Sequence, residues 1–305
     1  MSASAHTPDA VLRRLEWTVL RRLEGLLQGD YRTLFRGNGM DLAGLREYQE
    51  GDDVRRIDWN VTARMQSLHV REYQLDSELT AWFLLDLSPS MDCASDAVSK
   101  RNLLASFVAV MARLLTTRGN FCGAVLFNTG VDRVVPARSG RRHVLHLLDL
   151  LAARPRPVRP AKPGTTDLSA VLHGAAAMIR RRSVVFVVSD FVSRTDWGPA
   201  LERLSRRHDV VAIRLVDPLE AAIPDVGLLS FQDAETGEQI LVDTGRKEFR
   251  QRFGEAALQA EETIRTNFGR AGVDCLEVST SDDLLDAFVR FARMRKLRHT
   301  GNVIQ

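Results

Sequence analysis

The chain has 305 residues, of which 45% are hydrophobic and 27% are charged. This composition is typical of a folded globular protein, and it excludes a disordered, collagen-like or disulfide-scaffold protein. The formal net charge is only +3, so the charge balance by itself does not point to nucleic acid or to an anionic membrane. Three cysteines, Cys93, Cys122 and Cys275, lie far apart and form no CxxC pair, which argues against a zinc ribbon and for a reducing compartment.

The first predicted element is an amphipathic helix over residues 9 to 28. Leucine and valine recur there at three- and four-residue spacing, and arginine pairs occupy the other face. A basic helix of this kind can lie on a membrane, but docking on the body of the protein is the favoured interpretation. Because the arginines interrupt any signal-peptide core and the apolar runs are too short to span a bilayer, we expect a cytoplasmic protein.

The segment from 29 to 78 is rich in glycine and in charges of both signs, which predicts short strands and turns instead of long helices. Three arginines stand near three aspartates in it: Arg55, Arg56 and Arg64, and Asp52, Asp53 and Asp58. These side chains could form an ion-pair cluster, with Ile57 and Trp59 docked against the domain that follows. A solvated charged face is the open alternative.

From Leu79 onward, apolar strands alternate with helices. The strands are apolar throughout, which predicts an α/β domain with a doubly wound, mostly parallel sheet covered by helices on both faces. The predicted strands cover residues 79–85, 121–127, 131–135, 184–188, 210–215 and 273–278. The predicted helices cover 103–115, 143–151, 168–180, 197–207, 246–268 and 281–297.

Three connections complete the predicted layout. Asn128-Thr-Gly130 predicts a tight hairpin between two strands, and the proline-rich segment 154–164 predicts an extended loop. Residues 228–232 and 239–242 predict a second hairpin, inserted near 217–245. We therefore expect an N-terminal helix with a glycine- and charge-rich extension over residues 1–78, and the α/β domain over 79–298.

The most informative motif is Asp86-Leu-Ser-Pro-Ser90, which directly follows the first core strand. The carboxyl ends of parallel strands form the ligand crevice of such sheets, and carboxylate and hydroxyl oxygens suit a hard divalent cation. Two further oxygen-rich segments, Gly164-Thr-Thr-Asp167 and Ser189-Asp190, are placed to converge on the same ion. Each loop alone is weak evidence, because serine and aspartate are also the usual turn and N-cap residues.

The complete set resembles the metal-ion-dependent adhesion site of a von Willebrand factor A-type domain in five residues: Asp86, Ser88, Ser90, Thr166 and Asp190. The resemblance covers about residues 79 to 298 and implies a doubly wound sheet with the site on top. It implies that the three hydroxyl side chains ligate the ion and that the two aspartates act mainly through bound waters. The implied ion is Mg²⁺, or another hard cation such as Mn²⁺ or Ca²⁺, and Thr165 is an adjacent candidate ligand.

A second resemblance lies upstream of the first core strand. The bacterial family of domain of unknown function fifty-eight is similar in the string Leu45-Arg-Glu-Tyr-x-x-Gly-Asp-x-x-Arg-x-Ile-Asp-Trp-x-x-x-Ala-Arg64, followed by Leu68-His-Val-Arg-Glu72. With this string, the resemblance covers nearly the whole chain. It implies an adaptor protein, cytoplasmic or membrane-anchored, that works with a MoxR-type AAA+ ATPase.

The predicted function is non-enzymatic, metal-dependent protein binding, in which an acidic residue of the ATPase or of its client completes the coordination shell of the ion. The alternative is a metal-assisted phosphoryl hydrolase in the same crevice, with Asp92 and Asp167 as the spare acidic candidates. A membrane-surface scaffold built on the N-terminal helix is a third hypothesis. His143 and His146 stand three residues apart on a predicted helix, but no third metal ligand accompanies them.

Overall fold

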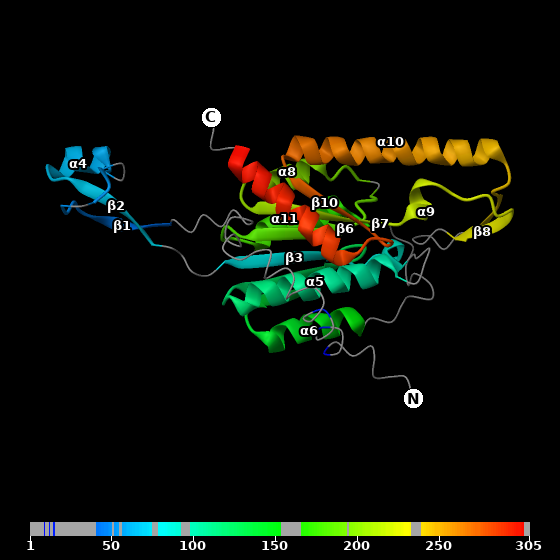
Figure 1. Ribbon diagram of the computed structural model, residues 1–305, viewed down its shortest axis with the longest axis horizontal. Coiled ribbons are helices and arrows are strands. Elements are labelled where there is room, and N and C mark those ends of the chain that lie inside the picture. The colour runs from blue at the N-terminus through cyan, green and yellow to red at the C-terminus, as the bar shows by residue number, and fades with distance from the viewer. Residues whose placement is uncertain are drawn as a thin grey trace.

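A computed structural model describes Asp9, Leu12, Leu15 and residues 41–50, 52–54, 57–74, 79–92, 98–153, 166–193, 195–232 and 239–301. Its centre is a six-stranded sheet in the order β10-β7-β6-β3-β4-β5 (Figure 1). The strands are β3 (Thr80–Asp86), β4 (Phe121–Phe127), β5 (Val131–Arg138), β6 (Val184–Ser189), β7 (Asp209–Val216) and β10 (Asp274–Ser279). Neighbouring strands are parallel except for the edge hairpin of β4 and β5. The predicted fold class, an α/β protein with a doubly wound and mostly parallel sheet, is confirmed.

Helices cover both faces of this sheet, because alternate residues of each buried strand point to opposite sides. One apolar cluster joins the sheet to α5 (Lys100–Thr117), α6 (Arg141–Ala152) and α11 (Leu284–Gly301). The other joins it to α7 (Leu168–Met178), α8 (Gly198–Ser205) and α10 (Lys247–Ala271). The fully buried core therefore lies on both sides of β3 and β6, the two strands whose ends carry the candidate site.

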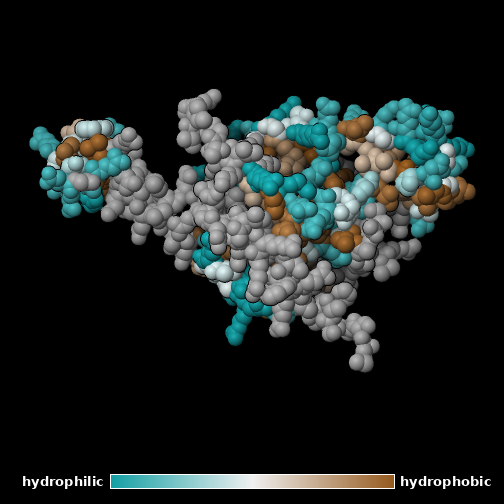
Figure 2. All heavy atoms as spheres, in the orientation of Figure 1, coloured by the Kyte–Doolittle hydropathy of each residue, from teal (hydrophilic) through white to brown (hydrophobic). Residues whose placement is uncertain are grey.

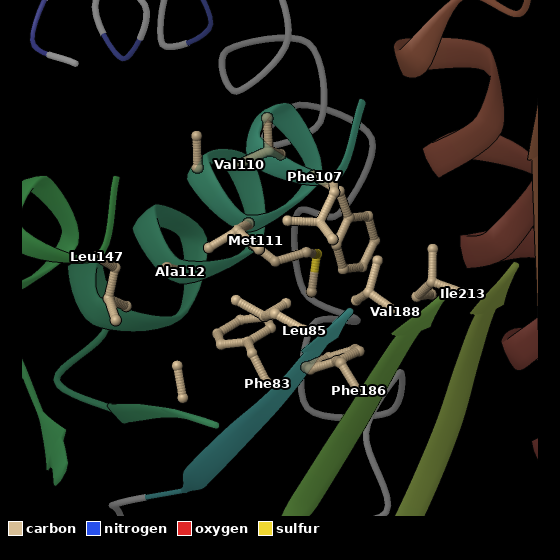
Figure 3. Close-up of a cluster of buried hydrophobic side chains, with 14 of the residues drawn as sticks. Phe83, Leu85, Phe107, Val110, Met111, Ala112, Leu147, Phe186, Val188 and Ile213 are labelled. Carbon is tan, nitrogen blue, oxygen red and sulfur yellow. The ribbon is translucent and has the colours of Figure 1, made fainter. Parts of the chain in front are cut away.

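Aromatic rings fix α5 on the sheet (Figure 3). Phe186 of β6 stacks on Phe83 of β3 with 5.2 Å between ring centroids, and Phe107 of α5 meets Phe186 edge-on at 5.9 Å. Phe107 also stacks on Phe288 of α11 at 5.4 Å. Each of these rings is at most 3% exposed, so the helix that follows the Asp86 loop is tied to both central strands.

Every strand and helix predicted after Leu79 is present where the structure describes the chain, with boundaries shifted by a few residues. Both α7 and α8 end two residues before the predicted positions, and α7 ends at Met178 because Ile179 turns extended and is buried. The predicted loop over 154–164 and the turn at Glu235-Thr-Gly237 lie outside the described residues. The inserted hairpin is formed by β8 (Leu228–Gln232) and β9 (Gln239–Asp243), and it follows the short helix α9 (Pro218–Ala221).

The described residues between 41 and 74 form a small unit, the N-terminal lobe, which Figure 1 shows set apart from the six-stranded sheet. It consists of β1 (Asp41–Glu47) paired antiparallel with β2 (His69–Gln74), and of α4 (Trp59–Met65). Ile57 is buried and bridges to Val70 of β2. The short strands predicted for this segment are present in its described part, but the short helix α4 was not predicted.

The expectation that Trp59 docks against the sheet domain is wrong, since its side chain is 66% exposed. The physical reason is that α4 has no buried residue and so presents no face to the sheet. The predicted charge cluster also differs: Asp52 forms a two-point ion pair with Arg46, at 2.7 Å for each contact, and Asp58 caps α4 by accepting two backbone N–H bonds. Arg55 and Arg56 lie outside the described residues.

The start of the N-terminal helix is packed on the sheet domain. Asp9, Leu12 and Leu15 are helical, and both leucines belong to the apolar cluster that includes α5 and α6. Asp9 pairs with Arg141 of α6 at 3.0 Å. This agrees with docking on the body of the protein; the rest of the predicted helix over 9–28 lies outside the described residues.

Two of the three cysteines are described, and both are unpaired. Their positions in apolar strands predict that both are buried; Cys122 on β4 is fully buried, but Cys275 is only partly buried, because β10 is an edge strand of the sheet. Cys93 lies outside the described residues. Across the described ranges, no helix has both the length and the apolar character needed to cross a membrane.

Candidate metal centre

The Asp86 loop is folded by its own hydrogen bonds. Asp86 is the last residue of β3, and its Oδ1 accepts the backbone N–H of Ser88 at 2.9 Å. The chain then enters the 3₁₀ turn η3 (Pro89–Asp92), which places the Ser88 and Ser90 hydroxyl oxygens 3.0 Å apart. Neighbouring ligands of an octahedral Mg²⁺ ion with bonds of 2.0 to 2.1 Å are about 2.9 Å apart. The spacing of the two hydroxyls therefore suits adjacent ligands of one small cation.

The second loop reaches the same point because β6 is the parallel neighbour of β3. Ser189, the last residue of β6, donates its hydroxyl proton to Asp86 Oδ2 at 2.6 Å. Asp190 follows directly and is 2% exposed. Phe191 next to it has a left-handed backbone with φ of 60°, an unusual conformation for a bulky residue, and is held by ring contacts with Trp197 and Phe268. Aromatic packing thus fixes the chain immediately after Asp190.

Asp86 and Asp190 repel each other in a buried setting. The pKa of Asp86 is raised from 3.8 to about 6, mainly by burial and secondly by the charge of the neighbouring Asp190 carboxylate. The hydrogen bonds from Ser189 and Ser88 to the Asp86 carboxylate act in the opposite direction, but they do not cancel the rise in pKa. Two buried carboxylates of this kind are stabilised by a cation placed between the loops.

A lysine that the sequence analysis did not single out already supplies one positive charge. Lys100 is the first residue of α5 and is fully buried, and its Nζ lies 2.9 Å from Asp190 Oδ2 and 2.5 Å from Glu220 Oε1. A signal was present in the sequence, because Lys100-Arg101 directly precedes the helix predicted over 103–115, at the end where the helix dipole disfavours cations. Glu220 is a second contributor with no signal in the sequence, whereas Ser189 belongs to the predicted Ser189-Asp190 segment but is not one of the five predicted ligands.

Thr166 stands on the third loop and is 4% exposed. Its carbonyl oxygen accepts a hydrogen bond from the Ser193 hydroxyl at 3.0 Å, which ties this loop to the chain that follows Asp190. The structure thus brings Asp86, Ser88, Ser90 and Asp190 together at the carboxyl ends of β3 and β6, here called the β3–β6 rim. The Thr166 loop is attached to this rim through Ser193. Thr165 lies outside the described residues.

The two spare acidic candidates serve the local structure. Asp92 is bound by both Nε and Nη2 of Arg101, at 2.5 and 3.0 Å. Asp167 caps α7 by accepting the N–H of Ala170 at 3.0 Å, and it also accepts the Thr195 hydroxyl at 2.9 Å. Neither carboxylate is placed as a base beside the Asp86 loop by these contacts.

The histidine pair forms no metal site of the usual kind. His143 is buried and its Nε2 lies 2.6 Å from the carbonyl oxygen of Cys122, while the His146 ring centroid is 6.5 Å from that of His143. Within the described part of the chain, no group of three or more His, Cys, Asp or Glu side chains is arranged to hold a metal. Hydroxyl oxygens are therefore essential to any ion at the β3–β6 rim, and two carboxylates with the two serine hydroxyls are donors of the kind that fits a hard divalent cation.

Comparison with known proteins gives a family and a set of relatives. The family described as protein of unknown function DUF58 matches residues 44–263. The uncharacterized protein Rv1480 of Mycobacterium tuberculosis is 35% identical over 289 residues, which are 94% of this chain and 89% of that protein. Among solved structures, BatB from Bacteroides thetaiotaomicron is 15% identical with a TM-score of 0.47, covering 72% of this chain and 98% of BatB. A von Willebrand factor type A protein from Catenulispora acidiphila is 14% identical with a TM-score of 0.40, covering 72% of this chain and 42% of that one.

Proposed function

The chain belongs to the DUF58 family of proteins of unknown function, and we propose that it is a non-enzymatic adaptor that binds a partner protein through a divalent cation at the β3–β6 rim. The observation that carries this proposal is the pair of serine hydroxyls, 3.0 Å apart, beside two buried carboxylates that repel each other. Ser88, Ser90 and Thr166 would hold the ion directly, and Asp86 and Asp190 would hold it mainly through bound waters. The ion is Mg²⁺, or Mn²⁺ or Ca²⁺ in its place.

When bound, the cation supplies a Lewis-acid position that a carboxylate of the partner completes. The chain's own residues keep that position ordered. Asp86 orients the serine loop by accepting the Ser88 N–H, and Ser189 holds the Asp86 carboxylate from the neighbouring strand. The aromatic packing of Phe191 keeps Asp190 at the rim. Recognition of an acidic residue then requires no movement of the sheet.

The proposed partner is a MoxR-type AAA+ ATPase or its client, and the proposed location is the cytoplasm. Support for the partner comes from the string over residues 45–72, since its similarity to DUF58 members implies a MoxR-type ATPase. Support for a reducing compartment comes from the chemistry of the thiols, since the two described cysteines are unpaired.

A metal-assisted phosphoryl hydrolase is the less favoured function for the same crevice. That reaction needs a base or nucleophile beside the ion that is not itself a ligand. Asp92 is engaged by Arg101 and Asp167 caps α7, so the contacts of both carboxylates support the proposal of a binding site over that of a hydrolase.

Calorimetric titration of the full chain with Mg²⁺ or Mn²⁺ tests the metal site. The Ser88→Ala/Ser90→Ala variant is expected to bind either ion at least about tenfold more weakly, because two oxygen ligands are lost. Ser279→Ala/Ser281→Ala is the matched control: these hydroxyls are also two residues apart and 2.9 Å from each other, at the end of β10. The metal site is refuted if both double variants bind the ion as the wild-type chain does.

The partner proposal is tested with a purified MoxR-type ATPase from the same organism, using surface plasmon resonance at constant Mg²⁺. The wild-type chain and the Ser279/Ser281 control are expected to bind equally, and the Ser88/Ser90 variant at least about tenfold more weakly. Constant Mg²⁺ keeps the nucleotide state of the ATPase the same in every arm. Equal binding by all three proteins would show that the ion is not the recognition element.

A further inference from the structure

Lys100 is buried in an unfavourable place for a cation. It opens α5, where the N-terminal end of the helix dipole is positive, and its side chain is fully excluded from solvent. Burial alone lowers the pKa of Lys100, but the carboxylates of Asp190 and Glu220 outweigh it and hold the pKa above that of a free lysine. The ammonium is therefore a permanent charge of the site, kept there by these two acids.

The position of this charge matters for any ion that binds nearby. Lys100 Nζ is 2.9 Å from Asp190 Oδ2, and Asp190 is one of the two carboxylates assigned to the candidate metal site. The other oxygen of Asp190 accepts the N–H of Val192 at 3.1 Å. A divalent ion and the ammonium would thus draw on the same carboxylate and repel each other across it.

The second partner of Lys100 comes from a different element. Glu220 lies on α9, and its Oε1 is 2.5 Å from Lys100 Nζ. Its Oε2 accepts the backbone N–H of Asp217, the N-cap residue of α9, at 3.3 Å. The Glu220 side chain is 43% exposed, whereas Asp190 is buried. One ammonium therefore joins the buried rim to a short, partly exposed helix beside it.

We propose that Lys100 is a built-in counter-cation of the metal site, whose ammonium competes with the divalent ion for the carboxylate of Asp190. Because Lys100 also pairs with Glu220, binding of the ion would change the contacts of α9. This inference rests on the proposed function, because it assumes an ion at the rim. Without the ion, the lysine neutralises Asp190 and keeps the loops folded. With the ion bound, Asp190 is shared between the ion and Lys100, and the ammonium shifts toward Glu220. Binding of the ion therefore changes the structure or dynamics of α9.

Calorimetric titration with Mn²⁺ tests the competition. Lys100→Met is expected to bind Mn²⁺ about tenfold or more tightly than the wild-type chain, because the repelling charge is gone. Lys247→Met, at the first residue of α10, is the control and is expected to leave the affinity unchanged. Tighter binding by Lys100→Met is opposite in sign to the loss expected for the Ser88/Ser90 variant, so general damage to the rim cannot produce it.

Glu220→Gln provides a second test if Lys100→Met does not fold. This variant is expected to fold, because the Glu220 side chain is 43% exposed. Lys100 would then pair with Asp190 alone, and Mn²⁺ binding is expected to weaken about three- to tenfold. Glu202→Gln on α8 is the control, since that glutamate is 41% exposed and also forms a single ion pair, with Arg206 at 2.7 Å. Unchanged Mn²⁺ affinity in Glu220→Gln would overturn the inference.

Hydrogen exchange of the α9 amides, followed with and without Mg²⁺, tests the link to the surface. Mg²⁺ is expected to change exchange over residues 217–222 in the wild-type chain but not in Lys100→Met.

The Mn²⁺ titrations separate a failure of this inference from a failure of the proposed function. If the wild-type chain binds Mn²⁺ and neither Lys100→Met nor Glu220→Gln changes that affinity, the counter-cation is refuted while the metal site stands. If Lys100→Met binds Mn²⁺ and the wild-type chain does not, the competition is supported and the proposed function fails. If no variant binds Mn²⁺, both fail.

Discussion

Asp86 shows how one buried residue carries the chemistry of the site. Its carboxylate is only 2% exposed, and both of its oxygens accept hydrogen bonds, from the Ser88 N–H and from the Ser189 hydroxyl. These two bonds do not compensate for burial and for the charge of Asp190, so the pKa of Asp86 is raised to about 6. Near neutral pH, where Asp86 is ionised, its carboxylate is therefore less favourable in the folded chain than in the unfolded chain, and it lowers the stability of the fold.

The pH dependence of stability follows from this shift. Between pH 3.8 and about 6 the folded chain keeps a proton that the unfolded chain releases, so the contribution of Asp86 to stability falls as the pH rises. The loss is complete above about pH 6 and is on the order of 3 kcal/mol. Urea unfolding at pH 4.5 and pH 7, in chelator, is expected to show a smaller loss for Asp86→Asn than for the wild-type chain.

Mg²⁺ provides the second arm of that measurement. A cation near the rim lowers the pKa of Asp86 and is expected to reduce the loss in the wild-type chain, leaving Asp86→Asn less affected. An identical pH dependence for Asp86→Asn and the wild-type chain would show that Asp86 is not the group responsible.

At the scale of elements, α5 links the site to the core. Its first residue, Lys100, reaches the Asp190 carboxylate, and one face of the helix packs Phe107 against β6 and α11. The loop after β3 is thus followed by a helix whose position is set by close packing. This rigidity keeps the carboxylate and hydroxyl oxygens of the loops after β3 and β6 at fixed positions relative to one another.

Phe107→Ala tests that support. The ring is 1% exposed, so its removal leaves a cavity between the sheet and α11 and is expected to lower the free energy of unfolding by about 3 to 5 kcal/mol. Trp59→Ala, also a large aromatic truncation, is expected to change it by less than about 0.5 kcal/mol, because that side chain is 66% exposed. Chemical denaturation measures both, and a similar loss in the two variants would contradict the assigned packing.

At the scale of the whole molecule, the described chain divides unevenly between one large core and small additions. Leu12 and Leu15 belong to the main apolar cluster, whereas neither cluster contains any of the described residues of the N-terminal lobe. The hairpin of β8 and β9 also stands outside the six-stranded sheet, and it exposes Leu228 and Leu241, at 67% and 69%. Figure 2 shows hydrophobic side chains at the surface at that end of the molecule. The start of the N-terminal helix therefore packs with the sheet domain, although the lobe separates the two in sequence.

Leu12→Ala and Ile57→Ala distinguish these two relationships. Leu12 is fully buried in the main cluster, so Leu12→Ala is expected to lower the free energy of the main unfolding transition by about 2 to 5 kcal/mol. Ile57 is buried only within the lobe, so Ile57→Ala is expected to increase hydrogen exchange over 57–70 and to leave the main transition in place. A shift of the main transition by Ile57→Ala would show that the lobe folds as part of the sheet domain.

Local pattern was sufficient for the strands, the helices and the fold class. Continuous apolar runs such as Val184–Val188 are typical of strands buried on both faces, and only a sheet covered by helices on both sides buries them. The string from Leu45 to Glu72 was likewise enough for the DUF58 family, which is confirmed. The five candidate site residues could be named from sequence because their loops follow strands on the side expected for ligands, and because the complete set resembles the adhesion site of a von Willebrand factor A-type domain.

Only the tertiary structure decided which charges meet. The order of strands sets β6 beside β3, and this neighbourhood alone brings Ser189 to Asp86, 103 positions away. Lys100 and Glu220 are separated by 120 positions, and no local pattern relates them. The burial of Trp59 was misjudged for the same reason, since exposure depends on what packs over a side chain. Periodicity reports the local backbone and one apolar face, whereas electrostatic contacts between distant loops depend on the order in which strands assemble.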